Sequence, residues 1–270
     1  MSKPELKLVR SSSDIPAIRL EEFQAWFGEG CVVNVPALEF PSHQITCLVG
    51  PSGSGKSTLL RSLNRINDDI PTYSMQGQIF VQDQCTHAGF KDITQLRSKV
   101  GMVFQRPCVF PCSIRENVLF GVRDKSLSKI DRALLVEDCL KSAALWKEVS
   151  HRLDSPADTL SLGQQQRLCI ARTLAVKPDI LLLDEPTASV DPVSARALET
   201  VIQDLKQRFT IIMVTHDIRQ TKRIADHVVF LCDGDMIESG SCQHMFSKTC
   251  LLYTSPSPRD ATLSRMPSSA

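Results

Sequence analysis

The chain has 270 residues, of which 42% are hydrophobic and 23% charged, and its formal net charge is +1. This composition predicts a globular protein with a sizeable buried core, in one large or two smaller domains. A charge so close to zero argues against a broad electrostatic contact with nucleic acid, and no apolar run approaches the roughly 18 residues that would cross a bilayer.

The first informative elements are a predicted strand and a predicted helix joined by a glycine-rich loop. Residues 45–49, ITCLV, form a short apolar run that ends in glycine. The stretch KSTLLRSLNRI then places four apolar side chains on one helical face. These are Leu59, Leu60, Leu63 and Ile66.

The loop itself reads GPSGSGKST over residues 50–58. Glycines let its backbone curl so that successive N–H groups point inward at phosphate oxygens. We expect Lys56 to neutralise the β and γ phosphates of a nucleotide, and the Ser57 hydroxyl to bind Mg²⁺. A glycine turn with a solvated lysine is the alternative, which the flanking strand and helix make remote. The residues expected at the phosphates are Gly50, Pro51, Ser52, Gly53, Ser54, Gly55, Lys56, Ser57 and Thr58.

Between about residues 107 and 160 the pattern changes to helix signals without strands. Ser128 and Asp131 are spaced as a capping box at the start of one such helix. The apolar residues that follow are Ile130, Leu134 and Leu135. We interpret this segment as a helical insertion in an α/β core. Gln105, in VFQRP, lies at the junction with the insertion, where a surface glutamine without a function is the alternative.

The stretch DTLSLGQQQRLCIAR, residues 158–172, predicts the start of another helix. Ser161 and Gly163 suit a small turn, and Leu168 and Ala171 then share one stripe. A helix N-terminus presents unpaired backbone N–H groups and a partial positive charge. This helix start is therefore a natural site for an anion.

Two adjacent carboxylates follow the apolar run of ILLLDE, which predicts a buried parallel strand within residues 179–185. Asp184 is placed to hold Mg²⁺, directly or through water, and Glu185 points to the opposite side, where it could polarise an attacking water. A solvated turn is the alternative, which a phosphate loop on the same sheet disfavours.

The next predicted helix starts with Asp191 as its cap and Pro192 at its first position. Its expected buried stripe consists of Val193, Ala197, Leu198, Val201 and Leu205. A further buried strand, residues 210–216, ends at His216, for which a structural and a catalytic role are equally open. The stretch HVVFLCDGDMIESG then predicts a hairpin that turns at Asp233 and Gly234.

The ten cysteines are scattered, and some lie in apolar segments, as Cys47 and Cys232 do. Buried, reduced thiols are the expected state. The pair Cys108 and Cys112 has no His or second Cys pair at zinc spacing nearby, so no metal site is expected there.

Five motifs together resemble the ATP-binding subunits of ABC transporters in order and spacing: GPSGSGKST, VFQRP, LSLGQQQR, LLLDEPTASVD and TH. The resemblance covers roughly residues 18–246. It implies a P-loop NTPase core of ABC type, in which a parallel sheet with helices is joined to an antiparallel β part. It also implies an ATP-binding domain over residues 18–249, a helical subdomain at about 107–165, and ATP and Mg²⁺ as cofactors.

The same resemblance implies roles at matching positions. Glu185 would be the general base, His216 the switch histidine, and Gln105 a sensor that also reaches the metal beside Ser57 and Asp184. The signature would be Ser161, Gly163 and Gln164, and Asp191 would lie in the D-loop. In this family two copies pair head to tail, so the helix start after Ser161 would hold the γ-phosphate of the ATP bound by the partner.

Two further positions carry expectations from the resemblance. The stretch QAWFGEG is similar to the segment whose aromatic ring stacks on adenine, which favours Phe27, with Trp26 second and a packed core aromatic as the alternative. The signature departs from LSGGQ at Leu162, where a larger side chain narrows the backbone approach. We expect an active but slow ATPase, with a nucleotide-binding protein without turnover as the alternative.

Further stretches, among them STLLRSLNRINDDIP and VGMVFQRPCVFPCSIRENVLFGVR, resemble the ATP-binding subunits of bacterial phosphate importers. This resemblance implies phosphate as the transported solute and a location on the cytoplasmic face of the membrane. It implies three kinds of partner, which are a second copy of the chain, two transmembrane permease subunits and, indirectly, an external solute-binding protein. The surface that receives the permease would include Phe110, Pro111 and Ile114, and an ordinary core of the helical subdomain is the alternative for these residues. Transport of another solute, or a soluble ABC ATPase outside transport, is the alternative.

The ends of the chain differ from the rest in composition. Residues 1–17 are expected to form a flexible arm. The stretch YTSPSPRDATLSRMPSSA is rich in Ser and Pro and has no apolar stripe. Residues 250–270 are therefore expected to be a disordered or non-native tail, with a cloning remnant and a solvated native segment as the two interpretations.

Overall fold

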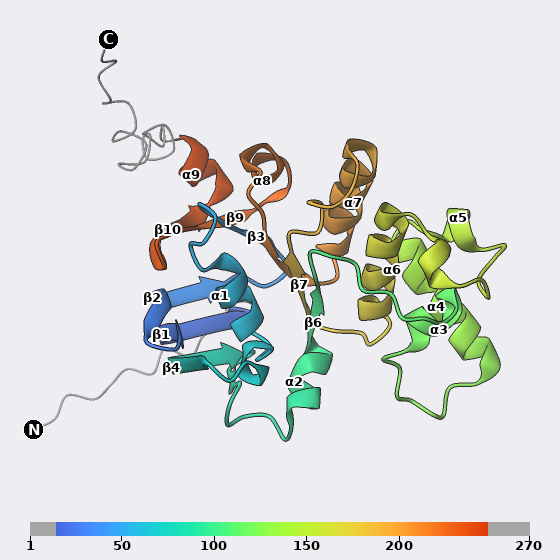
Figure 1. Cartoon of the computed structure of the whole chain (residues 1–270), viewed down its shortest axis with the longest axis horizontal. Coiled ribbons are helices and arrows are strands. Elements are labelled where there is room, and N and C mark those ends of the chain that lie inside the picture. The colour runs from blue at the N-terminus through green and yellow to red at the C-terminus, as the bar shows by residue number, and fades with distance from the viewer. Residues whose placement is uncertain (1–14, 248–270) are drawn as a thin grey trace, which may run out of the picture.

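The structure is a computed structural model that describes residues 15–247. The tail expected at 250–270 lies outside these residues, as does most of the arm expected at 1–17. The described chain is a mixed α/β fold in which helices pack against one large sheet (Figure 1). No helix in this part of the chain is long and apolar enough to span a membrane.

Ten strands of the described chain form the sheet, in the order β5-β4-β1-β2-β10-β9-β3-β8-β7-β6. Their bounds are β1 Ile18–Phe27, β2 Gly30–Phe40, β3 Ile45–Val49, β4 Tyr73–Val81, β5 Gln84–Cys85, β6 Val100–Val103, β7 Ile180–Asp184, β8 Thr210–Val214, β9 His227–Cys232 and β10 Asp235–Ser241. Strands β5, β4, β1 and β2 pair antiparallel, whereas β9, β3, β8, β7 and β6 pair parallel. The sheet thus combines the parallel and antiparallel parts that the sequence predicts.

The helices of the described chain are α1 Lys56–Ser62, η1 Asn67–Asp69, α2 Ile93–Lys99, α3 Ile114–Leu119, α4 Lys129–Ser142, α5 Trp146–Val149, η2 Ala157–Thr159, α6 Leu162–Leu174, α7 Pro192–Leu205, α8 Ile218–Ile224 and α9 Cys242–Ser247. Helices α3 to α6 lie together to one side of the sheet, beyond α7 and β6 (Figure 1). They connect β6 to β7 along the chain.

The central strands β3, β7 and β8 are buried along their whole length, which confirms their prediction as strands covered on both faces. Alternate side chains enter different clusters. In β7, Leu181 and Leu183 pack with residues of α3 to α7, whereas Ile180 and Leu182 pack with residues of β1, β2 and α1. The strands therefore hold both layers together and fix where their own carboxyl ends lie.

Helix α1 is shorter than the apolar pattern predicts. Leu59, Leu60 and Leu63 are fully buried, as expected. The helix nevertheless ends at Ser62, and Ile66 lies beyond it, half-buried. The cause is local, because Arg65 has a φ of 62°, a left-handed conformation that stops a right-handed helix.

Helix α7 begins as predicted, but its buried stripe differs from the prediction. Pro192 is its first residue, and the Asp191 carboxylate accepts hydrogen bonds from two N–H groups of the first turn. Val193 is 79% exposed and Ala197 is also exposed, so both were wrongly placed in the core. The stripe follows the helical period through Leu198, Val201, Ile202 and Leu205, and an earlier turn of that stripe reaches Ser194 and Ala195 instead.

The predicted capping box and hairpin are both present. The Ser128 side chain caps α4 reciprocally with Asp131, while Ile130 and Leu134 are 72% and 59% exposed. Strands β9 and β10 pair antiparallel on either side of Asp233 and Gly234.

The cysteines only partly follow the expectation of burial. Nine in the described part of the chain are free thiols, of which Cys47, Cys139 and Cys169 are buried. Burial raises the pKa of Cys139 to about 12, so this thiol stays protonated and unreactive. Cys232 is half-buried at the last position of β9, and Cys108 is exposed in the loop after β6.

Candidate active site

The glycine-rich loop joins the buried end of β3 to α1 and needs glycine for two different reasons. Gly53 has a φ of 82° but open space around its missing Cβ, so the backbone conformation alone requires glycine there. At Gly55 a Cβ would lie 2.4 Å from the carbonyl oxygen of Val32 in β2. The loop is therefore packed tightly against β2 at Gly55, whereas no atom lies close to the missing Cβ of Gly53.

Lys56 begins α1 and folds back over the loop. Its ammonium donates to the carbonyl oxygens of Gly50, at 3.0 Å, and Pro51, at 2.6 Å. Burial lowers the pKa of Lys56, while the nearby Glu185 and Asp184 raise it. The cation is thus held inside the loop by the loop itself, which suits a group that meets phosphate oxygens.

Asp184 ends β7 and is almost fully buried, at 1% exposure. One of its oxygens accepts a hydrogen bond from the Ser57 hydroxyl at 2.8 Å, and the other accepts from Arg61 Nη2 at 2.8 Å and Nε at 3.1 Å. Ser57 and Arg61 are one turn apart on α1, so they reach the same carboxylate. A hydroxyl and a carboxylate together are the hard oxygen donors that Mg²⁺ prefers, so these residues fit the metal.

Glu185, Gln105 and His216 come together although they are far apart in the sequence. Gln105 Nε2 donates to Glu185 Oε2 at 2.9 Å, and His216 Nδ1 lies 3.5 Å from the same oxygen. They follow the neighbouring parallel strands β6, β7 and β8, whose carboxyl ends meet at one edge of the sheet. Glu185 has a φ of 43°, a costly conformation for this residue type and one that recurs at functional sites.

Gln166 is a residue of the site that sequence reasoning missed. It is 1% exposed, and its Nε2 donates to the carbonyl oxygen of Phe104 at 3.0 Å. This bond fixes the backbone next to Gln105 against α6. A signal was present, because Gln166 precedes the buried Ile170 by one helical turn and is thus a polar residue on the apolar stripe.

Gln220 was also missed. It is 2% exposed in α8, donates to the hydroxyl of Thr187 at 3.0 Å, and accepts from the hydroxyl of Thr215 at 2.7 Å. Thr187 follows Glu185 by two residues and Thr215 precedes His216. Gln220 therefore joins the two turns that carry these expected catalytic side chains.

The signature residues form a well-defined helix start. Ser161 caps α6, its hydroxyl accepts from the N–H of Gln164, and Gln164 Oε1 accepts from the N–H of Ser161 at 3.0 Å. A Cβ at Gly163 would lie 2.8 Å from the Ser194 hydroxyl, so the starts of α6 and α7 are in close contact. Leu162 is 55% exposed.

The signature and the phosphate loop of one chain are not brought together. Helix α6 lies beyond β7, away from α1 (Figure 1). Asp191 lies at the start of α7, where hydrogen bonds from Ser194 hold its pKa below the usual value. Within a single copy, the helix start at Ser161, where an anion is expected, is therefore separated from the ammonium of Lys56.

Phe27 ends β1 and packs against Tyr73, with ring centroids 5.6 Å apart and an interplanar angle of 56°. Both Phe27 and Trp26 are half-buried. The adenine contact stays a prediction, and the contact with Tyr73 keeps the packed aromatic open as the alternative.

The sequence of the chain is similar to those of known ATP-binding proteins. Residues 33–188 match the model of the ABC transporter family. The chain is 45% identical to the phosphate import ATP-binding protein PstB of Thermotoga maritima, over 86% of this chain and 93% of that protein. It is 42% identical to PstB of Colwellia psychrerythraea, over 93% of this chain and 88% of that protein.

A solved structure shows the same fold. The structure of cbiO1 from Clostridium perfringens, part of the ABC transporter complex cbiONQ, superposes with a TM-score of 0.76 at 27% identity. The match covers 94% of this chain and 100% of that one. Because the family model matches more than half of the chain and relatives of more than 40% identity align over most of it, the chain belongs to the ABC transporter family, among its ATP-binding proteins.

Proposed function

We propose that this chain hydrolyses ATP to drive import of inorganic phosphate, as a peripheral subunit on the cytoplasmic face of a membrane. The observation that carries the ATPase part is the convergence of Gln105 and His216 on Glu185, one residue after the buried Asp184. The identity of 45% over most of the chain to a phosphate import protein supports the transported solute.

In the proposed reaction the loop N–H groups and Lys56 bind the ATP phosphates. Ser57, Asp184 and Gln105 would hold Mg²⁺, which would supply positive charge to neutralise the phosphate oxygens. Glu185 accepts the proton of the attacking water. Gln105 and His216 orient the carboxylate of Glu185 while it does so.

A second copy of the chain completes each site. Ser161, Gly163 and Gln164 of one copy would meet the γ-phosphate held by the Lys56 loop of the other, which gives two equivalent sites about a two-fold axis. The separation of α6 from α1 within one copy supports this arrangement (Figure 1).

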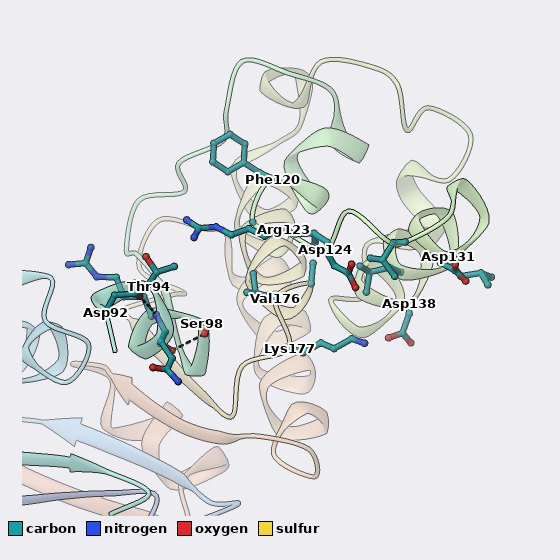
Figure 2. Close-up of a pocket in the computed structure, with 18 residues that line it drawn as sticks. Asp92, Thr94, Ser98, Phe120, Arg123, Asp124, Asp131, Asp138, Val176 and Lys177 are labelled. Atoms are coloured by element: carbon teal, nitrogen blue, oxygen red, sulfur yellow. Dashed lines mark hydrogen bonds between the residues drawn. The ribbon is translucent and has the colours of Figure 1, made fainter. Parts of the chain in front are cut away.

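A groove supplies a surface for the permease. It has a volume of about 1020 Å³ and lies between α2, α4 and the end of α6, with Phe120, Leu134 and Val176 among its apolar lining and Asp124 and Lys177 among its charges (Figure 2). We place a cytoplasmic helix of a permease subunit here. Its apolar face would cover the lining, and the charged rim would meet its polar face.

One of the residues expected on the permease surface does not lie on it. Ile114, which was expected to contribute to it, is fully buried as the first residue of α3 and contacts the core. Phe110 instead stacks on Phe120, with ring centroids 4.0 Å apart. Phe110 therefore supports a residue that lines the groove.

Replacing Leu134 with Asp should weaken attachment to permease-containing membranes at least about tenfold, because the contact would bury an unpaired charge. Ile130→Asp is the matched control, since Ile130 is exposed on the same helix but does not line the groove. Co-sedimentation with such membranes measures attachment. Equal losses for the two variants would contradict this docking surface.

Phosphate uptake in cells tests the proposed function. A strain without its own copy of the gene receives either the native chain or Glu185→Gln, and labelled phosphate uptake is compared at equal expression. High-affinity uptake with the native chain and its loss with Glu185→Gln are expected. Uptake with the native chain no higher than in the strain without the gene would refute phosphate as the solute, and equal high uptake with both chains would refute the role of Glu185.

A further inference from the structure

We propose that Glu148, which lies outside every motif, is a positioning residue that holds the signature in the shape that binds the partner's ATP. Glu148 lies in α5, 13 residues before Ser161 in the numbering of the chain. The inference rests on the proposed head-to-tail dimer. It concerns how the helix start of α6 keeps its side chains in place before the second copy arrives.

The first contact joins Glu148 to the signature glutamine. Gln164 Nε2 donates to Glu148 Oε2 at 2.8 Å. The other end of the same amide, Gln164 Oε1, accepts the N–H of Ser161 at 3.0 Å. Glu148 thus holds the amide in the orientation that completes the capping box, and without it the amide is free to rotate away from Ser161.

The second contact joins Glu148 to α6 one turn further on. Arg167 Nη1 donates to Glu148 Oε1 at 2.6 Å, and Nη2 donates to Oε2 at 3.2 Å. Arg167 is 7% exposed, and its Nη1 also donates to the carbonyl oxygen of Ala144 at 2.7 Å. A planar guanidinium bound at two points fixes both the distance and the direction between α5 and α6.

The electrostatics keep this carboxylate ionised. Burial raises the pKa of Glu148, but the hydrogen bonds from Arg167 and Gln164 outweigh burial and leave the pKa below its usual value. Glu148 is therefore charged at neutral pH and serves as acceptor for both donors at once.

Folding of α6 does not depend on these contacts alone. Leu168, Ile170 and Ala171 are at most 1% exposed and anchor the helix in the core. The cap of Ser161 adds a local bond that needs no other element. Loss of Glu148 should therefore leave the helix in place and disturb the orientation of Gln164 and Arg167.

The experiment separates binding by one chain from binding between chains. In the Glu185→Gln background, which should not consume ATP, a fluorescent ATP analogue measures binding to single chains at low protein concentration. Light scattering after size separation measures the dimer formed with ATP and Mg²⁺. The variants are Glu148→Ala and Glu148→Gln, and the control is Glu137→Ala, a surface glutamate of α4 that pairs only one turn away with Lys141.

Glu148→Ala should raise the ATP concentration for half-maximal dimer formation about tenfold, the loss expected for charged hydrogen bonds. Binding of ATP to single chains should stay close to that of the parent. The melting temperature should fall, because the buried Arg167 keeps only carbonyl partners when the carboxylate is lost. For Glu148→Gln the ATP concentration for half-maximal dimer formation should lie between those of the parent and Glu148→Ala, because its carbonyl oxygen still accepts one hydrogen bond. Glu137→Ala should match the parent.

Two results would overturn the inference alone, given a parent that dimerises. One is unchanged dimer formation by Glu148→Ala and Glu148→Gln, and the other is a parallel loss of binding to single chains, which would show general structural damage. Failure of the parent itself to dimerise with ATP would instead refute the proposed dimer, and the role of Glu148 with it.

Discussion

Glu185→Gln should reduce the turnover of ATP by about a hundredfold or more, while the affinity for ATP stays within about twofold. The amide cannot accept the proton of the attacking water. It still offers an oxygen to Gln105 Nε2, which lies 2.9 Å from the carboxylate, so the surrounding geometry is kept. Phosphate release measured with the purified chain, and again with the permease, gives the turnover.

The control for this variant is Glu238→Gln on β10, a half-buried glutamate in the β9–β10 hairpin. It should turn over ATP at the native rate. Substantial phosphate release by Glu185→Gln would remove Glu185 from the role of general base. A loss of ATP affinity equal to the loss of turnover would assign it to binding.

Lys56→Ala should weaken ATP binding about a hundredfold or more. The variant removes a buried cation that lies within the loop and is aimed at phosphate, and charged contacts of this kind carry a large share of anion affinity. Titration calorimetry with ATP and Mg²⁺ measures the affinity directly. Lys91→Ala, an exposed lysine before α2, is the control.

Lys56→Arg sharpens this test. The ammonium fits between the carbonyl oxygens of Gly50 and Pro51, and the broader planar guanidinium does not match that space. Lys56→Arg should therefore bind ATP far more weakly than the native chain. Native affinity in Lys56→Ala would contradict the assignment of this loop to the nucleotide phosphates.

The sequence predicts the central strands well because the signal for each one lies within its own few residues. Each of β3, β7 and β8 is a continuous apolar run, and a strand buried on both faces needs nothing else to be recognised. The ends of helices and the set of side chains that they bury are harder to predict. They depend on a few backbone dihedral angles and on how the helix is rotated about its axis relative to the core. The left-handed Arg65 ends α1 early, and the true phase of α7 leaves Val193 exposed.

The residues of the site also fall into two groups, those that the sequence predicts and those that only the fold reveals. Lys56, Asp184 and Glu185 stand out from motifs in which spacing and strand ends carry the signal. Arg61 and Glu148 do not, because their partners come from other elements and only the packed fold shows them within hydrogen-bond distance. The roles of the predicted site residues stay predictions, which the variants above test.

The buried Gln220 has a consequence for thermal motion. The turns after β7 and β8 carry Glu185 and His216, and two surface turns would ordinarily fluctuate independently. Gln220 donates to Thr187 and accepts from Thr215, which gives the two turns a shared support, so a displacement of one turn is accompanied by a displacement of the other. The distance between Glu185 and His216 should accordingly vary less than the position of either residue.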